Sequence, residues 1–256
     1  MDGTSQKPAL WMRLANPAVF NALANRVLLP LAVLTLAAFA YGLYGAFATS
    51  PADYQQGETV RIMYIHVPAA WLSLFVYAGM AASALGTLVF RHPVADVAQK
   101  AAAPLGAGFT LICLITGSFW GKPMWGTWWE WDARLTSVLI LFLIYLGIIA
   151  LWRAIDEPQR AARAVAIMTL VGAVNLPIIK FSVDWWYTLH QPASVFRMGG
   201  PTIHKSMLTP LLWMGLAYLL LYLCLLLVRM KTELMARRIE RLQILTADRQ
   251  AAGGGR

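Results

Sequence analysis

The chain has few charged residues, and acidic residues are the scarcer kind. Only 13% of its 256 residues are charged, whereas 59% are hydrophobic. That composition is typical of membrane proteins rather than of soluble domains. The formal charge of +9 could suit a nucleic-acid partner, but the basic residues stand at the ends of apolar runs. The positive-inside rule accounts for that placement better than a phosphate-binding face does. We therefore expect a membrane protein that binds lipid and no nucleic acid.

Cysteine is nearly absent, and several short functional motifs are missing. Cys113 and Cys224 both lie inside apolar runs, where a lone cysteine usually packs as a small hydrophobic residue. Neither belongs to a CxxCH motif or to a metal-type cysteine pair, so the chain is not itself a c-type cytochrome. Without a Walker motif, any ATP-driven step would need another subunit. Without an internal repeat, an inverted-repeat transporter is not supported.

Six long apolar runs predict six membrane-spanning helices, since a span needs about 20 mostly apolar residues. The fifth run is the shortest and contains Pro177. We expect an all-α polytopic membrane protein with three parts: an N-terminal segment over 1–26, a six-helix domain over 27–228, and a basic tail over 229–256. The predicted helices are Val27–Ala52, Ile62–Phe90, Ala101–Gly121, Leu135–Trp152, Ala164–Ile179 and Ser206–Val228.

The distribution of Lys and Arg predicts how these helices are oriented. The two ends of the chain and the second and fourth connections hold fifteen of these residues, against six in the other three connections. This asymmetry predicts that both termini are cytoplasmic. His66, the tryptophan-rich connection, His190 and His204 would then all lie at the outer face.

The tryptophans are concentrated in one place. Five of the eleven fall within twelve residues, at Trp120, Trp125, Trp128, Trp129 and Trp131. The spacing of Trp125, Trp128 and Trp129 would align these three on one face of a single helical turn, and the glycines and proline nearby indicate that the turn is short. Such a cluster suits a flat apolar ligand or the head-group region of a bilayer. Composition alone does not choose between the two.

The stretch Trp120–Ser137, WGKPMWGTWWEWDARLTS, resembles the signature of the WWD-domain family, the haem-handling proteins of cytochrome c maturation. Within that family the chain is similar to the CcmC branch. The resemblance extends from about Pro51 to Gln191. The other matching stretches are Pro51–Gly57, His66–Ala70, Asn175–Ile179, Trp185–Trp186 and Thr188–Gln191.

The resemblance implies that His66 and His190 are the axial ligands of a haem iron. Histidine is a common haem ligand, and two of them fill both axial positions. The tryptophans of the signature would then stack on the haem, which is expected to be b-type and transiently bound. His204 shares a connection with His190 but lies outside the matching stretches, so it ranks below His190. His92 lies at the other face and is interpreted as an ordinary loop residue.

Charged residues near the tryptophans are candidates for the haem carboxylates. Arg134 could bind a propionate with two hydrogen bonds, and Asp132 could pair with Arg134 or accept from an indole N–H. Arg61 and Lys122 are equally well placed, and the sequence does not rank the three cations. Glu130 and Asp132 are two residues apart and would lie on different helix faces, so they do not suggest an acid–base enzyme.

The resemblance implies a haem-delivery protein of the bacterial inner membrane whose site faces the periplasm. It would pass haem to the chaperone CcmE and work with CcmD and with the ABC-type subunits CcmA and CcmB. One alternative is an enzyme, a haem lyase or synthetase that attaches haem directly to apocytochrome, although such relatives are generally longer. The other is a haem channel, for which the first, third and fourth apolar runs offer no charged path.

Overall fold

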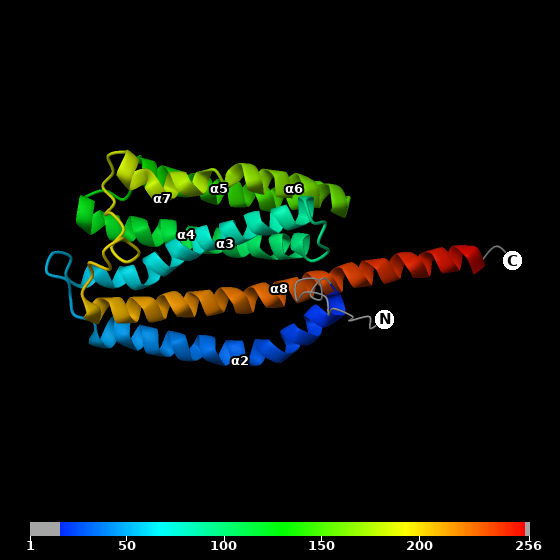
Figure 1. Ribbon diagram of the computed structural model, residues 1–256, viewed down its shortest axis with the longest axis horizontal. Helices are drawn as coiled ribbons and strands as arrows, with labels where there is room; N and C mark the ends of the chain where they lie inside the picture. The colour runs from blue at the N-terminus through cyan, green and yellow to red at the C-terminus, as the bar shows by residue number, and fades with distance from the viewer. Residues whose placement is uncertain (1–15, 254–256) are drawn as a thin grey trace, which may run out of the picture.

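The computed structural model describes residues 16–253, and over that range it contains helices and no strand (Figure 1). Six helical segments are long and apolar enough to cross a membrane, which confirms the predicted fold class of a multi-pass α-helical protein. The elements are α2 (Pro17–Tyr44), η1 (Gly45–Thr49), η2 (Glu58–Ile62), α3 (Met63–Leu88), α4 (Ala95–Trp125), α5 (Ala133–Ala154), α6 (Pro158–Gly172), α7 (Asn175–Trp185) and α8 (Lys205–Gly253).

The first helix begins ten residues before the predicted start at Val27, because local capping chemistry outweighs polarity there. The side chain of Asn16 accepts a hydrogen bond of 2.9 Å from the Ala18 N–H, and Pro17 occupies the first helical position. Both are favourable helix-start features. Residues 1–15 of the predicted N-terminal segment lie outside the described residues.

The fifth span is two helices rather than one. α6 and α7 are separated at Ala173–Val174, and Pro177 falls in the first turn of α7, where its missing N–H removes no helical hydrogen bond. A side chain at Gly172 would meet the Tyr77 hydroxyl of α3 at 2.1 Å. The same hydroxyl donates to the Thr169 carbonyl at 3.1 Å. α3 therefore approaches α6 closely at the residue before the break, where a side chain would not fit.

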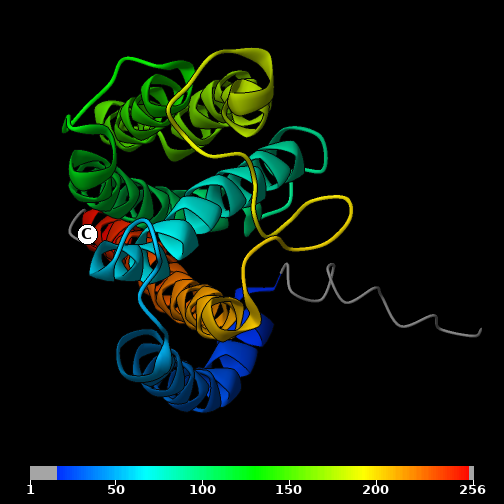
Figure 2. The same cartoon turned by 90° about the vertical axis from the view of Figure 1, so that its left-hand side faces the viewer.

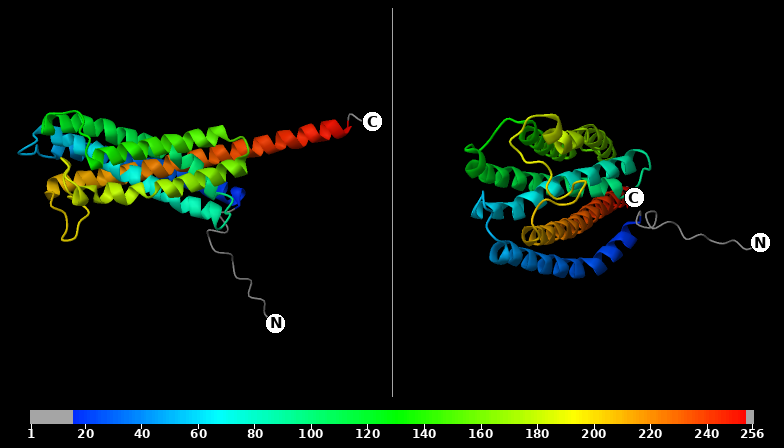
Figure 3. Two further views of the ribbon diagram at one scale, coloured as in Figure 1. Left: turned by 90° about the horizontal axis from the view of Figure 1, so that it is seen from above. Right: turned by 60° about the vertical axis from the view of Figure 1, so that its left-hand side comes forward.

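The helices pack as one bundle in which α3 and α4 are central. α3 contacts α4, α6 and α8, whereas α2 packs mainly on α8 (Figures 1 and 3). Buried polar side chains within the bundle find partners on other helices: the Tyr145 hydroxyl donates to the Ser73 backbone carbonyl at 2.8 Å, and the Gln99 amide donates to the Thr169 hydroxyl at 3.0 Å. Such pairing is what a membrane interior demands, because lipid offers no hydrogen-bond partners.

The connections divide between two ends of the bundle. Residues 50–57, 126–132 and 186–204 lie together at one end, here called the tryptophan end (Figures 1 and 2). Residues 89–94 and 155–157, the start of α2 and the long extension of α8 lie at the other, here called the opposite end. Within the described residues, the segments that the count of Lys and Arg assigned to one side therefore lie at one end. Which end faces the cytoplasm stays a prediction.

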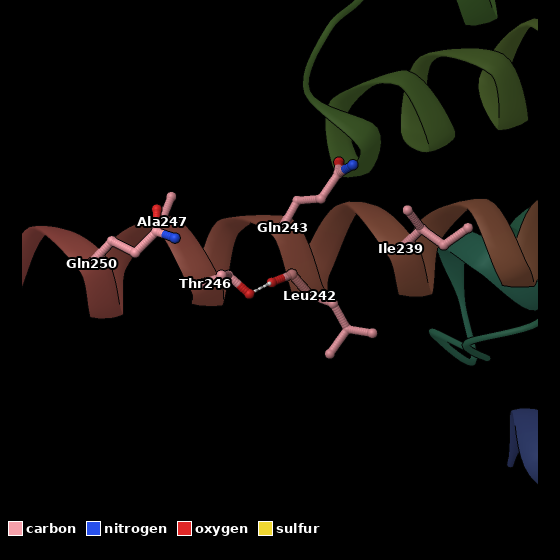
Figure 4. Close-up of a pocket in the computed structure, with 6 residues that line it drawn as sticks. All are labelled: Ile239, Leu242, Gln243, Thr246, Ala247 and Gln250. Carbon is pink, nitrogen blue, oxygen red and sulfur yellow. Dashed lines mark hydrogen bonds between the residues drawn. The ribbon is translucent and has the colours of Figure 1, made fainter.

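α8 continues well beyond the bundle instead of ending at Val228. Ion pairs anchor it to α4 where it leaves: Lys100 to Glu233 at 2.8 Å, and Arg237 to Asp96 at 2.7 Å. Further along, Ile239, Leu242, Thr246 and their neighbours line a shallow hollow on the helix surface (Figure 4). This hollow belongs to the opposite end and is remote from the tryptophans.

Candidate functional site

His66 lies in the second turn of α3 and is 9% exposed. Its Nδ1 is 3.1 Å from the Cys113 carbonyl oxygen and 3.2 Å from Thr116 Oγ1, both on α4. A carbonyl can only accept, so the ring donates through Nδ1–H. The remaining nitrogen, Nε2, keeps its lone pair. A hydrogen bond from the other ring nitrogen is the usual way in which a protein orients a metal-binding histidine.

The surroundings of His66 are shaped by α4 and by residues 50–57. The Trp120 ring meets the His66 ring edge-on at 5.6 Å. Its indole N–H donates to Gln56 Oε1 at 2.8 Å. Asp53 holds that connection in a tight turn by accepting from the backbone of Gln55 and Gln56 at 2.9 Å each. The matching stretch Pro51–Gly57 therefore has a physical role here, which is to brace Trp120.

His190 lies in the connection between α7 and α8, and its Nδ1 is 2.9 Å from the Gln191 carbonyl oxygen. Its Nε2 is therefore also the lone-pair nitrogen. His190 is close enough to His66 to act on it electrostatically, and Arg134 acts on both. Burial lowers the pKa of His190, Arg134 lowers that pKa further, and the hydrogen bond to Gln191 and the charge of Asp132 oppose the shift. The structure thus brings together two residues that are 124 positions apart.

Asp132 is the N-cap of α5, where its Oδ1 accepts from the Leu135 N–H at 2.8 Å. Its Oδ2 accepts from the Thr188 hydroxyl. The Thr188 Oγ1 in turn accepts from the backbone N–H of His190 at 3.1 Å. The expected pairing of Asp132 with an indole N–H is absent among the described residues. Instead, its carboxylate joins α5 to the connection that carries His190.

The other two histidines have different arrangements. His204 is exposed and caps α8: its carbonyl accepts from Leu208 N–H at 2.9 Å, and its Nδ1 accepts from Ser206 N–H at 3.3 Å. The same Nδ1 is 2.8 Å from the Ser206 hydroxyl oxygen, so the ring of His204 is engaged at the start of α8. His92 belongs to the connection 89–94, which lies at the opposite end of the bundle.

The predicted helical turn over Trp125–Trp129 is wrong. α4 ends at Trp125 because Gly126 follows in the left-handed conformation at φ 77°, which only glycine adopts without strain. Residues 126–132 then form an irregular connection. The Thr127 hydroxyl bonds the backbone at Trp129, at 2.8 Å to its carbonyl oxygen.

The five tryptophans therefore form separate pairs rather than one stack. Trp120 contacts His66, and the Trp125 ring packs over Gly121. Trp128 is 52% exposed beside Phe119, and Trp131 is 73% exposed beside Trp129. The indole Nε1 of Trp129 is buried and has no hydrogen-bond partner among the described residues. An unpaired buried donor of this kind calls for an acceptor that the described chain does not supply.

The three cations that are candidates for binding the haem propionates differ in their hydrogen-bond and ion-pair partners. Arg61 pairs with Glu58, and its Nη1 donates to the Ala46 carbonyl at 2.6 Å. Lys122 donates to the Gly126 carbonyl at 2.9 Å and lies 5.8 Å from the Trp128 ring centre. Arg134 is half-buried and donates through Nη1 to the Ile179 carbonyl. Of the three, Arg134 is the one that acts on both histidines.

The arrangement suits iron that brings its own equatorial ligands. No group of three or more His, Cys, Asp or Glu side chains capable of holding a bare metal ion exists among residues 16–253. Two imidazoles in an apolar, aromatic setting are instead the kind of side chain that can ligate a haem iron.

Comparison with known proteins shows the family of the chain. Residues 10–245 match the model of the family described as CcmC, Heme exporter protein C. The chain belongs to this family. It is 64% identical over 238 residues to Heme exporter protein C of Bradyrhizobium diazoefficiens, which covers 93% of this chain and 90% of the relative.

More distant relatives match at similar coverage. Heme exporter protein C of Escherichia coli K12 is 49% identical over 205 residues, covering 80% of this chain and 82% of the relative. Heme exporter protein C of Paracoccus denitrificans is 44% identical over 226 residues, covering 88% and 93%. The family match over residues 10–245 includes every residue of the site described above, from Ala46 to Leu208.

Proposed function

We propose that the protein binds haem as cargo at the tryptophan end, with His66 and His190 as the two axial ligands, and delivers it for cytochrome c maturation. The observation that carries the proposal is that the same nitrogen, Nδ1, is hydrogen-bonded in both rings. Each donates Nδ1–H to a backbone carbonyl, at 3.1 Å for His66 and 2.9 Å for His190, and so presents Nε2 as a ligand. His204, by contrast, bonds to no backbone carbonyl through its ring among the contacts described above, and its Nδ1 lies against Ser206 at the start of α8.

The setting of the histidines supports a large, flat, apolar cargo. Trp120 borders His66, and Trp125, Trp128, Trp129 and Trp131 lie along the end of α4 and the connection after it. Aromatic side chains contribute much apolar contact area at little loss of conformational freedom. The exposed rings of Trp128 and Trp131 would be covered by the cargo or by its acceptor.

One unpartnered donor and one arginine support a location for the haem propionates. The Trp129 indole N–H is buried without a partner among the described residues, and the charge of Arg134 acts on both histidines. Arg61 is already paired with Glu58 and with the Ala46 carbonyl. We infer that Arg134 and Trp129 bind the carboxylates, while Arg61 holds η2 against η1. Lys122 is held to the backbone of Gly126 and is assigned to the rim of the site.

The finer functional assignments follow the family. The haem is b-type and held transiently, and the acceptor is the chaperone CcmE. CcmD and the pair CcmA and CcmB are the membrane partners, in the bacterial inner membrane with the tryptophan end facing the periplasm. The relatives are named for haem export, which supports delivery over direct attachment to apocytochrome.

The function is tested with ferric haem added to the purified full-length protein in detergent. We expect a Soret band with the low-spin features of two imidazole ligands, and transfer of that band to added CcmE. A protein that gives no Soret band beyond that of free haem would contradict the proposal. Direct attachment to an apocytochrome peptide without a chaperone would instead favour a haem lyase.

The membrane orientation gives a separate expected result. A reporter that is active only outside the cytoplasm should work when fused within the tryptophan end and fail when fused at the opposite end. The first set of fusions follows Gly57, Thr127 and Ser194, and the second follows Pro93, Glu157 and Arg249. Activity after Arg249 would reverse the orientation and place the proposed site in the cytoplasm.

A further inference from the structure

The two histidines are held in different ways. The His66 ring bonds directly to α4, and its backbone belongs to a long helix. His190 belongs to an irregular connection, and its ring bonds only to the carbonyl of the next residue in the same connection. A contact within one connection cannot fix where that connection lies. A bond to another element must therefore hold His190 near His66.

A chain of hydrogen bonds supplies one such link. Thr188 accepts from the His190 N–H at 3.1 Å and donates its own hydroxyl hydrogen to Asp132. Asp132 is fixed at the start of α5 through its other oxygen, which accepts from Leu135 N–H at 2.8 Å. A carboxylate acceptor makes a hydrogen bond stronger than a neutral one does. The chain of bonds therefore runs from a rigid helix end to the backbone of His190.

The link can open without disturbing the helix that anchors it. Asp132 uses Oδ1 for the cap and Oδ2 for Thr188. Breaking the Thr188 bond leaves the cap intact, so α5 need not unwind. By contrast, removing the ring partners of His66 would require α3 and α4 to separate. The two ligands thus differ in how much structure must change for each to leave the iron.

We propose that Asp132 and Thr188 form a latch that positions His190 for iron ligation, and that opening this latch precedes release of the haem. The proposal rests on the haem-binding function proposed above. Thr188 and Asp132 are positioning residues in it, because they act through His190 and not on the iron. His66 stays with the haem until the acceptor has bound on the side vacated by His190.

The test compares four variants of the full-length protein loaded with ferric haem. Thr188→Val keeps the shape of the side chain and removes both hydrogen bonds. Thr188→Ser keeps the hydroxyl. Asp132→Ser keeps a good helix cap but is too short to reach Thr188. Thr202→Val is the matched control, because it removes a threonine hydroxyl that bonds to Ser194 in the same connection.

We expect Thr188→Val and Asp132→Ser to retain haem on the order of tenfold less well, the lower range for groups that orient a metal ligand. Their haem should show high-spin character that free imidazole converts back to the low-spin spectrum, at a lower imidazole concentration than the wild type needs for any change. Thr188→Ser and Thr202→Val should behave like the wild type. A merely structural defect would lower haem content without creating a position open to imidazole.

The outcomes separate the latch from the function on which it rests. If Thr188→Val and Asp132→Ser keep the low-spin spectrum and the haem retention of the wild type while His190→Gly loses both, the latch is refuted and the ligation stands. If His190→Gly itself retains the wild-type spectrum, the assignment of His190 as a ligand fails instead. Loss of haem from Thr188→Val without rescue by imidazole also refutes the latch, since the vacant position would not then be at His190.

Discussion

Replacing either His66 or His190 with glycine is expected to remove most of the haem from the purified protein. Each change deletes one of two axial ligands, and both rings are held with Nε2 free for iron. The remaining imidazole would leave one position open. The measurement is the Soret absorbance per protein and the position of its maximum, compared with the wild type.

Free imidazole should restore the lost haem in both variants, because it can occupy the vacated position without a backbone tether. The rescue should need more imidazole for His66→Gly than for His190→Gly. His66 fills a space that is enclosed by Cys113, Thr116 and Trp120, whereas His190 lies on a connection at the surface of the bundle.

His204→Gly is the matched control, since it removes a histidine from the same connection as His190. Its Nδ1 accepts from the Ser206 N–H, so its loss should weaken the start of α8 slightly and leave the spectrum unchanged. Loss of haem from His204→Gly with rescue by imidazole, beside a wild-type His190→Gly, would show that the second ligand is misassigned.

The second large effect is expected at Gly117, where α4 passes the His66 ring. A Cβ at this position would be 2.9 Å from His66 Cε1 and 3.4 Å from Nδ1. The ring cannot easily retreat, because its Nδ1 is bonded to Cys113 and the Trp120 ring lies against it. Gly117→Val should therefore turn the imidazole away from the iron.

We expect Gly117→Val to lower haem affinity by about 10–100-fold, the range typical of changes that disturb the orientation of a metal ligand. Gly117→Ala should have a smaller effect of the same kind, because its methyl group adds only the Cβ that meets the ring, whereas valine adds two further methyl groups. Gly108→Val on the same helix is the control, since nothing lies within 4 Å of a Cβ there. Equal loss from both valine variants would indicate a general defect of α4 and not a specific effect on His66.

The fold was largely predictable because lipid imposes simple rules on sequence. Runs without charge marked all six spans, and the cation distribution separated the two ends. The errors in the predicted helix ends arose where a helix continues into a polar segment. α2 starts at an asparagine cap inside a polar segment, and α8 runs on into a basic tail. Helices in water need no apolar run, so hydropathy cannot locate their ends.

The site was predictable only in its side chains. The family resemblance named His66, His190 and the tryptophans as candidates, but the orientation of the two histidine rings depends on backbone carbonyls at Cys113 and Gln191. Every residue has a backbone carbonyl, so the type of residue does not show which carbonyl will accept from a histidine ring. Thr188 did lie within a matching stretch, and a threonine hydroxyl that accepts from the backbone N–H two residues later is a known turn pattern. The role of Thr116, fifty positions from His66, left no such signal.

The extension of α8 sets a spatial requirement at the opposite end of the molecule. A helix of 49 residues is about 73 Å long at 1.5 Å per residue, more than twice the thickness of a bilayer core of about 30 Å. A short isolated helix in water is disfavoured by the free energy needed to form its first turn. The extension of α8 avoids this cost, because it continues from turns that are already formed within the bundle and passes the ion pairs of Glu233 and Arg237. Any subunit that closes over this face must therefore accommodate a rod standing well clear of the lipid.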